Sequence, residues 1–167
     1  MSLDADLERI AQQERELRLS RLDAQVAWDL ATRLREMALE RRFALVIDVR
    51  RFSEQMFYVA LDGTTPDNAE WVRRKSNVVA RFHRSSYAVG LTQKSKGTTL
   101  IERYGLSVAD YAADGGSFPL AVEGTGVVGS VTVSGLPQRD DHNLVVEALC
   151  AILGREYASL RLPPEAP

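Results

Sequence analysis

The sequence from Gly115 to Pro137 constrains the fold more than any other part of the chain. Apolar residues alternate in SFPLAV (117–122), which predicts a strand because successive side chains of a strand point to opposite faces. The following EGTG (123–126) predicts a tight reversal, since glycine adopts positive φ at little steric cost. A second strand then contains Val127, Val128, Val131 and Val133, with Gly129 marking a bulge or a close backbone approach, and residues 134–137 form the next turn. The order predicts an antiparallel pair that leads directly into a helix.

The remaining sequence predicts a second strand pair and several helices. Apolar spacings of three and four indicate helices, and short apolar runs bounded by turn residues indicate strands. The predicted helices cover residues 3–19, 20–41, 65–85, 87–94 and 138–154, with short helical turns at 98–104 and 107–113. The predicted strands at 43–49 and 55–61 form a hairpin. Two separate antiparallel blocks with helices around them predict one α+β domain whose sheet is covered on both faces.

The length of 167 residues is enough for one domain with a sizeable core. We expect a first helix over residues 1–19 that is mobile or docks on a partner, a single α+β domain over 20–157, and a loose proline-containing tail over 158–167. No apolar run approaches the roughly 18 residues that span a bilayer, and the charged N-terminus lacks the apolar core of an export signal. The single cysteine, Cys150, is expected to be reduced and buried. These features predict a cytoplasmic protein without membrane contact.

The distribution of charge is uneven, although the net charge is only −2. Residues 71–96 contain seven bases and no acid, whereas residues 97–167 contain nine acids against four bases. The basic segment could face an anionic ligand or the acidic surface of another subunit, or it could be a solvated helix face. Nucleic acid is not the expected partner, because the whole chain is slightly acidic and carries no nucleic-acid-binding motif.

Several kinds of functional site are excluded because their sequence motifs are missing or misplaced. The letters GTGVVG (124–129) match a dinucleotide fingerprint, but they join strand to strand rather than strand to helix. No nucleophile elbow is present, and the only cysteine lies within a helix. With only His83 and His142, a multi-histidine metal site is excluded, and no metal site is predicted.

The glycine turn at the start of the last helix is the expected ligand site. His142 lies beside this turn and is the best single candidate for ligand contact, although a capping or subunit-contact role is the alternative. The neighbouring Asp140 and Asp141 are expected to interact with the positive end of the helix dipole. The candidate ligand-binding residues are His142, Ser134, Gly135, Arg81, Lys75 and Trp71.

A catalytic site would require several reactive side chains to come together in the fold, and no motif in the sequence shows that they do. The groups available for such a site are Asp48, Arg81, Ser134 and His142. Asp48 and Arg50 lie on one face of the same predicted strand, so an ion pair at the strand end is the simpler interpretation. The sequence therefore favours a protein that binds rather than catalyses.

The sequence resembles a known family in three ordered motifs: GGSFP (115–119), GSVTVSG (129–135) and DDH (140–142). It is similar to the haem-degrading-domain family, also called HbpS-like or GlcG-like, and to the branch of it that carries VSGLPQRDDHNLVVEAL. The resemblance extends from about Leu22 to Ile152, and Trp71, Arg74, Lys75, Ser85 and Ser86 also fit that branch. It implies a profilin-like (GlcG-like) fold with a five-stranded antiparallel sheet between helices. It also implies assembly into dimers or larger rings.

Three functions follow as hypotheses. The first is an oligomeric small-molecule-binding protein, with haem or another anionic ligand held between sheet and helices near the basic segment. The second is a homo-oligomeric interaction or scaffold protein without chemistry of its own, which the charged first helix and the proline-rich tail favour. The third is an enzyme of unknown reaction.

Overall fold

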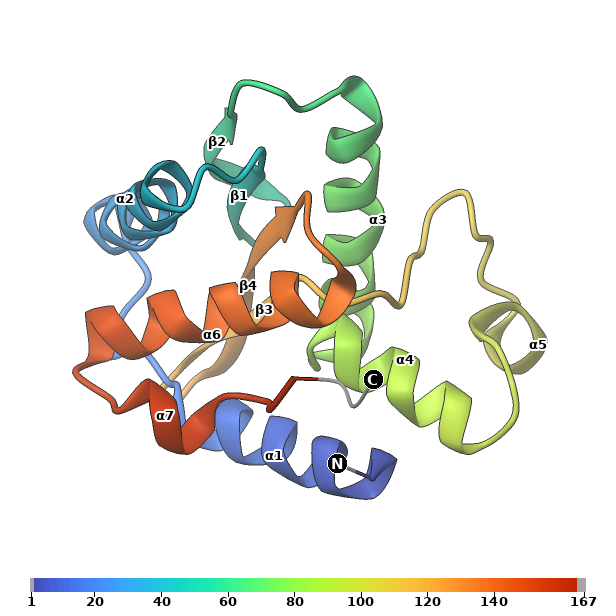
Figure 1. Ribbon diagram of the computed structural model, residues 1–167. Helices are drawn as coiled ribbons and strands as arrows, with labels where there is room; N and C mark the ends of the chain where they lie inside the picture. Colours follow the sequence, from blue (N-terminus) through green and yellow to red (C-terminus); the bar gives the residue numbers. More distant parts are fainter. Residues whose placement is uncertain (1, 165–167) are drawn as a thin grey trace.

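The strands form one antiparallel sheet in the computed structural model, which describes residues 2–164. The strands are β1 (Val46–Arg51), β2 (Glu54–Ala60), β3 (Ser117–Val122) and β4 (Gly126–Ser134). Their order across the sheet is β2-β1-β4-β3 (Figure 1). Both predicted hairpins are present, and pairing of β1 with β4 joins them into a single α+β domain.

Seven helices surround this sheet within residues 2–164. They are α1 (Leu3–Glu16), α2 (Ala24–Glu40), α3 (Pro66–Phe82), α4 (Ser86–Ser95), α5 (Leu100–Tyr104), α6 (Gln138–Leu153) and α7 (Tyr157–Leu160). Asp23 caps α2 by accepting a hydrogen bond from Val26 N at 2.9 Å. Gly154 ends α6 in the left-handed conformation, with φ +64°. The helical turn predicted at 107–113 is present as one hydrogen-bonded turn, in which Asp110 N and Tyr111 N donate to Ser107 O at 3.1 and 3.0 Å, and the rest of this segment is a loop.

The two faces of the sheet differ in chemistry. Helices α2 and α6 pack on the apolar face, where Ile47, Val49, Val131 and Val133 are fully buried. Helix α3 packs against the opposite face, and there the strands bury polar side chains that bond one another. Asp48 accepts from Arg50 Nε at 2.8 Å, which confirms the expected ion pair, and the Ser117 and Thr132 hydroxyls lie 2.8 Å apart. Burial of these groups is tolerated because each has a partner.

The five-stranded sheet implied by the family resemblance is wrong, because residues 2–164 contain four strands. Along the free edge of β3 the chain makes a single parallel bridge, in which Leu19 N donates to Ala121 O and Glu123 N donates to Leu19 O. The next residue that could pair here, Leu17, follows the end of α1, and its N–H donates to Gln13 O rather than to β3. The contact at this edge therefore stays one residue long.

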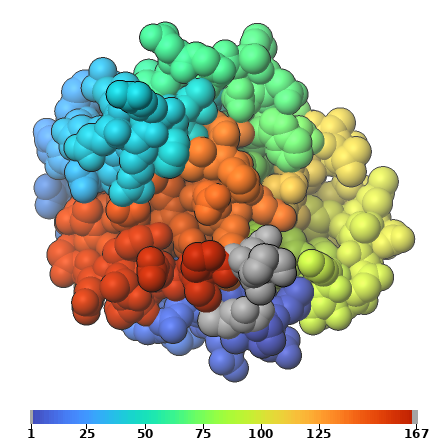
Figure 2. All heavy atoms as spheres, in the orientation of Figure 1, coloured from blue at the N-terminus to red at the C-terminus, as the bar shows by residue number. Residues whose placement is uncertain are grey.

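Both ends of the described chain pack onto the domain. Helix α1 contacts α4 and α7, and its Ile10 is fully buried against Tyr87 and Leu162. Figure 1 shows α1 and α7 side by side beneath α6, and Figure 2 shows the first and last described segments, in blue and red, next to each other on one surface. Leu160 and Leu162 are 1% exposed, and Pro163 O accepts from Arg139 Nε, so the tail is packed on the domain as far as Pro163. The rest of that prediction, at residues 165–167, lies outside the described residues.

No helix within residues 2–164 is both long enough and apolar enough to cross a membrane.

Candidate functional site

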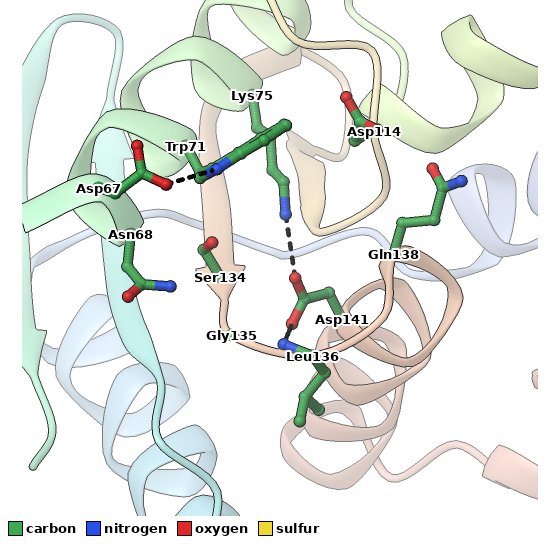
Figure 3. Close-up of a pocket in the computed structure, with 10 residues that line it drawn as sticks. All are labelled: Asp67, Asn68, Trp71, Lys75, Asp114, Ser134, Gly135, Leu136, Gln138 and Asp141. Carbon is green, nitrogen blue, oxygen red and sulfur yellow. Dashed lines mark hydrogen bonds and ion pairs between the residues drawn. The ribbon is translucent and has the colours of Figure 1, made fainter. Parts of the chain in front are cut away.

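A pocket of about 300 Å³ lies between α3, the glycine turn after β4 and the start of α6 (Figure 3). Its lining residues come from four separate parts of the chain: Asp67, Asn68, Trp71, Lys75, Asp114, Ser134, Gly135, Leu136, Gln138 and Asp141. Most of these side chains are polar or charged. The pocket therefore suits a small polar molecule better than an apolar one.

A buried ion pair joins the two helices that form this pocket. Lys75 Nζ lies 3.0 Å from Asp141 Oδ2 and 3.4 Å from the carbonyl oxygen of Val133. The Lys75 and Asp141 side chains are 4% and 1% exposed. The second carboxylate oxygen of Asp141 accepts a hydrogen bond from Leu136 N at 3.0 Å. Asp141 therefore holds both the lysine of α3 and the backbone of the glycine turn.

Opposing effects set the pKa of the Asp141 carboxyl. Burial raises the pKa of its carboxyl from the ordinary 3.8 to about 6, because a charge is costly away from water. The Lys75 ammonium and the backbone N–H groups of Leu136 and Gly135 oppose this rise by stabilising the carboxylate. The carboxyl thus titrates much closer to neutral pH than an exposed aspartate.

Two glycines allow the backbone to approach this ion pair. A Cβ atom on Gly116 would lie 2.6 Å from Val133 O and 2.8 Å from Lys75 Nζ, and φ at this residue is +130°. A Cβ atom on Gly135 would lie 2.1 Å from the carbonyl oxygen of Ala44. Since real Cβ contacts are longer, the geometry requires glycine at both positions.

The wall formed by α3 is ordered by side-chain contacts. Trp71 Nε1 donates to Asp67 Oδ2 at 3.1 Å, and the Arg74 guanidinium carbon lies 4.2 Å from the indole ring centroid. Asn68 accepts from Thr65 N at 2.9 Å in a capping box that begins the helix. These bonds hold Asp67, Asn68 and Trp71 in place along the pocket.

The structure brings four of the six predicted ligand-binding residues together. Trp71, Lys75, Ser134 and Gly135 all line the pocket, while His142 and Arg81 lie elsewhere. Arg81 is exposed near the far end of α3, with its guanidinium 6.0 Å from the Phe82 ring. Whether these residues bind a ligand stays a prediction.

His142 faces the protein interior rather than the pocket. It is 1% exposed and lies between the rings of Tyr87 and Phe118, at centroid distances of 5.4 and 5.9 Å. Its Nε2 lies 2.8 Å from Gln13 Oε1, and Gln13 Nε2 donates to Leu160 O. Gln13 Oε1 can only accept, so the imidazole carries its hydrogen on Nε2. Burial, with the positive charge of Arg139 nearby, lowers the imidazole pKa to about 3. The ring is therefore neutral and connects α6 to α1.

Sequence reasoning missed the acidic and amide residues of the pocket. The missed residues are Asp67, Asn68, Asp114, Leu136, Gln138 and Asp141. Asp67, Trp71 and Lys75 recur every four residues and so share one face of α3. That spacing could have added Asp67 to the predicted site. Asp141 lies in the first turn of α6, as the expected interaction with the helix dipole requires, and it also pairs with Lys75.

Within residues 2–164, no group of three or more His, Cys, Asp or Glu side chains is arranged to hold a metal ion.

Comparison with known proteins places this chain in a family. The family model described as haem degrading protein HbpS-like matches residues 22–150. The chain belongs to this family. A UPF0303 protein of Burkholderia thailandensis is 59% identical over 97% of this chain and 98% of its own length.

Two solved structures show the same fold. The crystal structure of the Ybr137w protein matches with a TM-score of 0.82 and 28% identity, over 89% of this chain and 88% of that one. The crystal structure of a PduOC:heme complex matches with a TM-score of 0.68 over 78% of this chain and 94% of that one. At 14% identity, the second likeness establishes a shared fold.

Proposed function

We propose that this HbpS-like chain is a small-molecule-binding protein whose ligand occupies the pocket between α3 and α6. The observation that carries the proposal is the buried Lys75–Asp141 pair beside a polar pocket. Two buried charges are costly to maintain, and such a pair contributes little net stability compared with an apolar packing of the same volume. Shifted titration next to a pocket is characteristic of functional sites.

The charges around the pocket define the ligand class. The Lys75 ammonium has three hydrogens, of which Asp141 and the Val133 carbonyl accept two. The third, together with the Ser134 hydroxyl and the N-terminal end of α6, suits an anionic oxygen. Asp67 and Asp114 also line the pocket and favour hydroxyl or amino groups on the remainder of the ligand. The proposed ligand is a small carboxylate or phosphate that carries such groups.

Haem does not fit this pocket. None of the ten lining residues is His, Cys, Met or Tyr, which are the usual axial ligands of haem iron. His142 is buried, neutral and bonded to Gln13. Haem stays a second candidate ligand for the protein as a whole, because the family is described as haem degrading and a structural neighbour was solved as a heme complex.

The test is mass spectrometry of small molecules released from the purified native protein, followed by calorimetric titration with the compound found. Ser134→Ala and Lys75→Met should each weaken binding about tenfold or more, because each removes a polar contact from the ligand. Ser130→Ala is the matched control, since Ser130 is equally buried on the same strand outside the pocket. Equal binding by the wild type and Ser134→Ala, with both proteins folded, would reject this site.

Haemin titration separates the two candidate ligands. If the proposal is right, haemin gives either no saturable Soret band or one that is the same in the wild type and Ser134→Ala, because haem would then bind outside this pocket. A saturable Soret band that Ser134→Ala abolishes would show that haem occupies this pocket and would refute the ligand class proposed above.

We also propose that the protein is a homo-oligomer that associates along β2. This strand ends the sheet, so one row of its backbone N–H and C=O groups is left unpaired by the sheet, and such an edge can pair with a second copy. Large apolar side chains are exposed around it: Trp28, Phe52 and Tyr58 are 59%, 73% and 43% exposed. An exposed edge rimmed by aromatic residues is typical of an association surface.

A further inference from the structure

A second pocket, of about 510 Å³, adjoins the first, and Trp71 lines both. It is enclosed by α3, α4, α5 and the loop over residues 106–114. The two pockets share only Trp71 and Asp114. The second is therefore a separate space, lined by different residues.

The loop that walls this second pocket is fastened to α3. Arg73 Nη2 donates to Ala109 O at 2.7 Å, Asn77 Nδ2 donates to Asp110 O at 2.9 Å, and Ala112 N donates to Arg74 O at 3.2 Å.

The same loop is pressed against α4. A Cβ atom on Gly90 would lie only 2.0 Å from the carbonyl oxygen of Ala113, so the contact needs a glycine within α4. A glycine inside a helix costs about 1 kcal/mol relative to alanine. The close contact at Gly90 thus fixes the distance between this loop and α4.

The interior of the second pocket is largely apolar. Leu100 is buried, and Leu106 and Tyr111 are partly buried against Val78 and Val89. Ile101 and Val108 also line the pocket, although they are 52% and 70% exposed. Two exposed aliphatic side chains beside an apolar pocket leave uncovered a surface that an apolar ligand would shield.

One buried polar group in this pocket has no partner. Gln93 is 6% exposed, and its Oε1 atom makes no hydrogen bond within the described residues. A buried acceptor without a donor costs about 1–3 kcal/mol. A bound molecule with an N–H or O–H group would satisfy it.

Two positive charges also line the pocket. Neither Arg74 nor Lys94 forms an ion pair with any carboxylate among residues 2–164. Arg74 lies over the Trp71 ring and donates to Val108 O at 3.3 Å. Asp114, the one acid in the lining, also borders the first pocket. The second pocket therefore combines an apolar interior with positive charge.

We propose that the second pocket binds an amphipathic organic anion: an aromatic or otherwise apolar body, a carboxylate or sulfonate facing Arg74 and Lys94, and a hydrogen-bond donor facing Gln93 Oε1. This site is additional to the one proposed above. It does not depend on the ligand of the first pocket.

The test uses two fluorescent probes that differ in one hydrogen-bond donor. An anilinonaphthalene sulfonate has an apolar body, an anion and one N–H group, and its N-methyl derivative lacks the N–H. Wild-type protein should bind the N–H probe at one molecule per chain and about fivefold more tightly than the N-methyl probe, the effect of one net hydrogen bond. Gln93→Leu should remove this preference, because the acceptor is gone.

Charge variants on exposed positions test the anion contact without endangering the fold. Lys94→Gln should weaken both probes about three- to fivefold, whereas Lys96→Gln should not, since Lys96 is exposed on the same turn and does not line the pocket. Ser134→Ala, in the first pocket, should leave probe binding unchanged. The proposal is overturned if binding does not saturate, if Lys94→Gln and Lys96→Gln bind alike, or if folded Gln93→Leu still prefers the N–H probe.

Discussion

Single residues set the electrostatics of the first pocket. Asp141 and His142 are adjacent in sequence and both buried, yet burial moves their pKa values in opposite directions. The carboxyl pKa rises to about 6 and the imidazole pKa falls to about 3, because burial favours the neutral form of each group. Both shifts make the stability of the fold depend on pH.

The first prediction concerns Asp141. Its folded pKa lies above the ordinary 3.8, so between about pH 4 and pH 6 the folded chain binds more protons than the unfolded chain. Stability from this group therefore rises as the pH falls through that window. We expect the wild type to gain unfolding free energy relative to Asp141→Asn between pH 6 and pH 4, measured by urea denaturation. His142 lowers stability as the pH falls, but it is present in both proteins, so its contribution cancels when their unfolding free energies are subtracted. If the difference in unfolding free energy between wild type and Asp141→Asn did not change with pH, the raised pKa of Asp141 would be contradicted.

At the scale of elements, the start of β3 must pass close to α6. Gly116 lies just before β3, and any side chain there would meet Val133 O and Lys75 Nζ below 3 Å. The Lys75–Asp141 contact between α3 and α6 thus depends on a missing Cβ atom in a third segment.

The second prediction is that Gly116→Ala destabilises the fold by about 2–4 kcal/mol, because it adds both a clash and an unfavourable positive φ. Gly124→Ala is the matched control: φ there is also positive, at +76°, but no atom lies within 4 Å of the added Cβ. It should cost only about 1 kcal/mol. Equal losses for the two variants in chemical denaturation would mean that backbone conformation alone, and not the close approach, requires Gly116.

Another element-scale contact fastens α1 to α6. Arg139 forms two hydrogen bonds with the Asp6 carboxylate, at 2.8 and 2.9 Å, and its Nε donates to Pro163 O at 2.7 Å. Both side chains are under 10% exposed. One arginine thus joins α1, α6 and the C-terminal segment.

The third prediction follows from this pair. Asp6→Asn should reduce the unfolding free energy by about 3 kcal/mol, because breaking a buried pair leaves the guanidinium charge uncompensated. Asp4→Asn, two residues earlier on the exposed side of α1, should change it by less than about 0.5 kcal/mol. If the two variants melt at the same temperature in calorimetry, the Asp6–Arg139 contact contributes nothing to stability.

At the scale of the whole molecule, the charge bias of the sequence is partly neutralised within the chain. Lys75 pairs with Asp141, Arg73 with Asp110, and Arg84 with Glu14. The first helix, which was expected to be mobile or docked on a partner, buries its Ile10 within its own chain. The proposed association therefore rests on the β2 edge and its exposed aromatic residues.

The fourth prediction is a light-scattering mass that is a multiple of 18.6 kDa at micromolar concentration. Trp28→Glu should lower that mass, since a charge on the proposed interface opposes association. Glu123→Lys, at an exposed position beyond the far edge of the sheet, is the control and should leave it unchanged. A mass of 18.6 kDa for the wild type would refute the oligomer, and an unchanged mass for Trp28→Glu would move the interface away from this surface.

Local patterns in the sequence were sufficient for most of the fold. Both hairpins and all the longer helices lie close to the predicted ranges, because period two and period 3.6 are properties of neighbouring residues. Helix ends are also local: Asp23 caps α2, three residues after the predicted start at residue 20, and Gly154 ends α6. The number of strands could not be predicted from local pattern, because it depends on the free edge of β3, where Leu17 N bonds Gln13 O and only Leu19 pairs with the strand.

Only part of the site could be predicted from the sequence, because the pocket is lined by segments that are distant along the chain. The glycine turn and the basic face of α3 were visible, and they supplied Ser134, Gly135, Lys75 and Trp71. What only the tertiary structure decided is how α6 is rotated about its axis. Successive helical residues point about 100° apart, so one of two neighbours faces the pocket and the other the interior. Packing of α6 against α1 and the sheet directs Asp141 to Lys75 and His142 to Gln13.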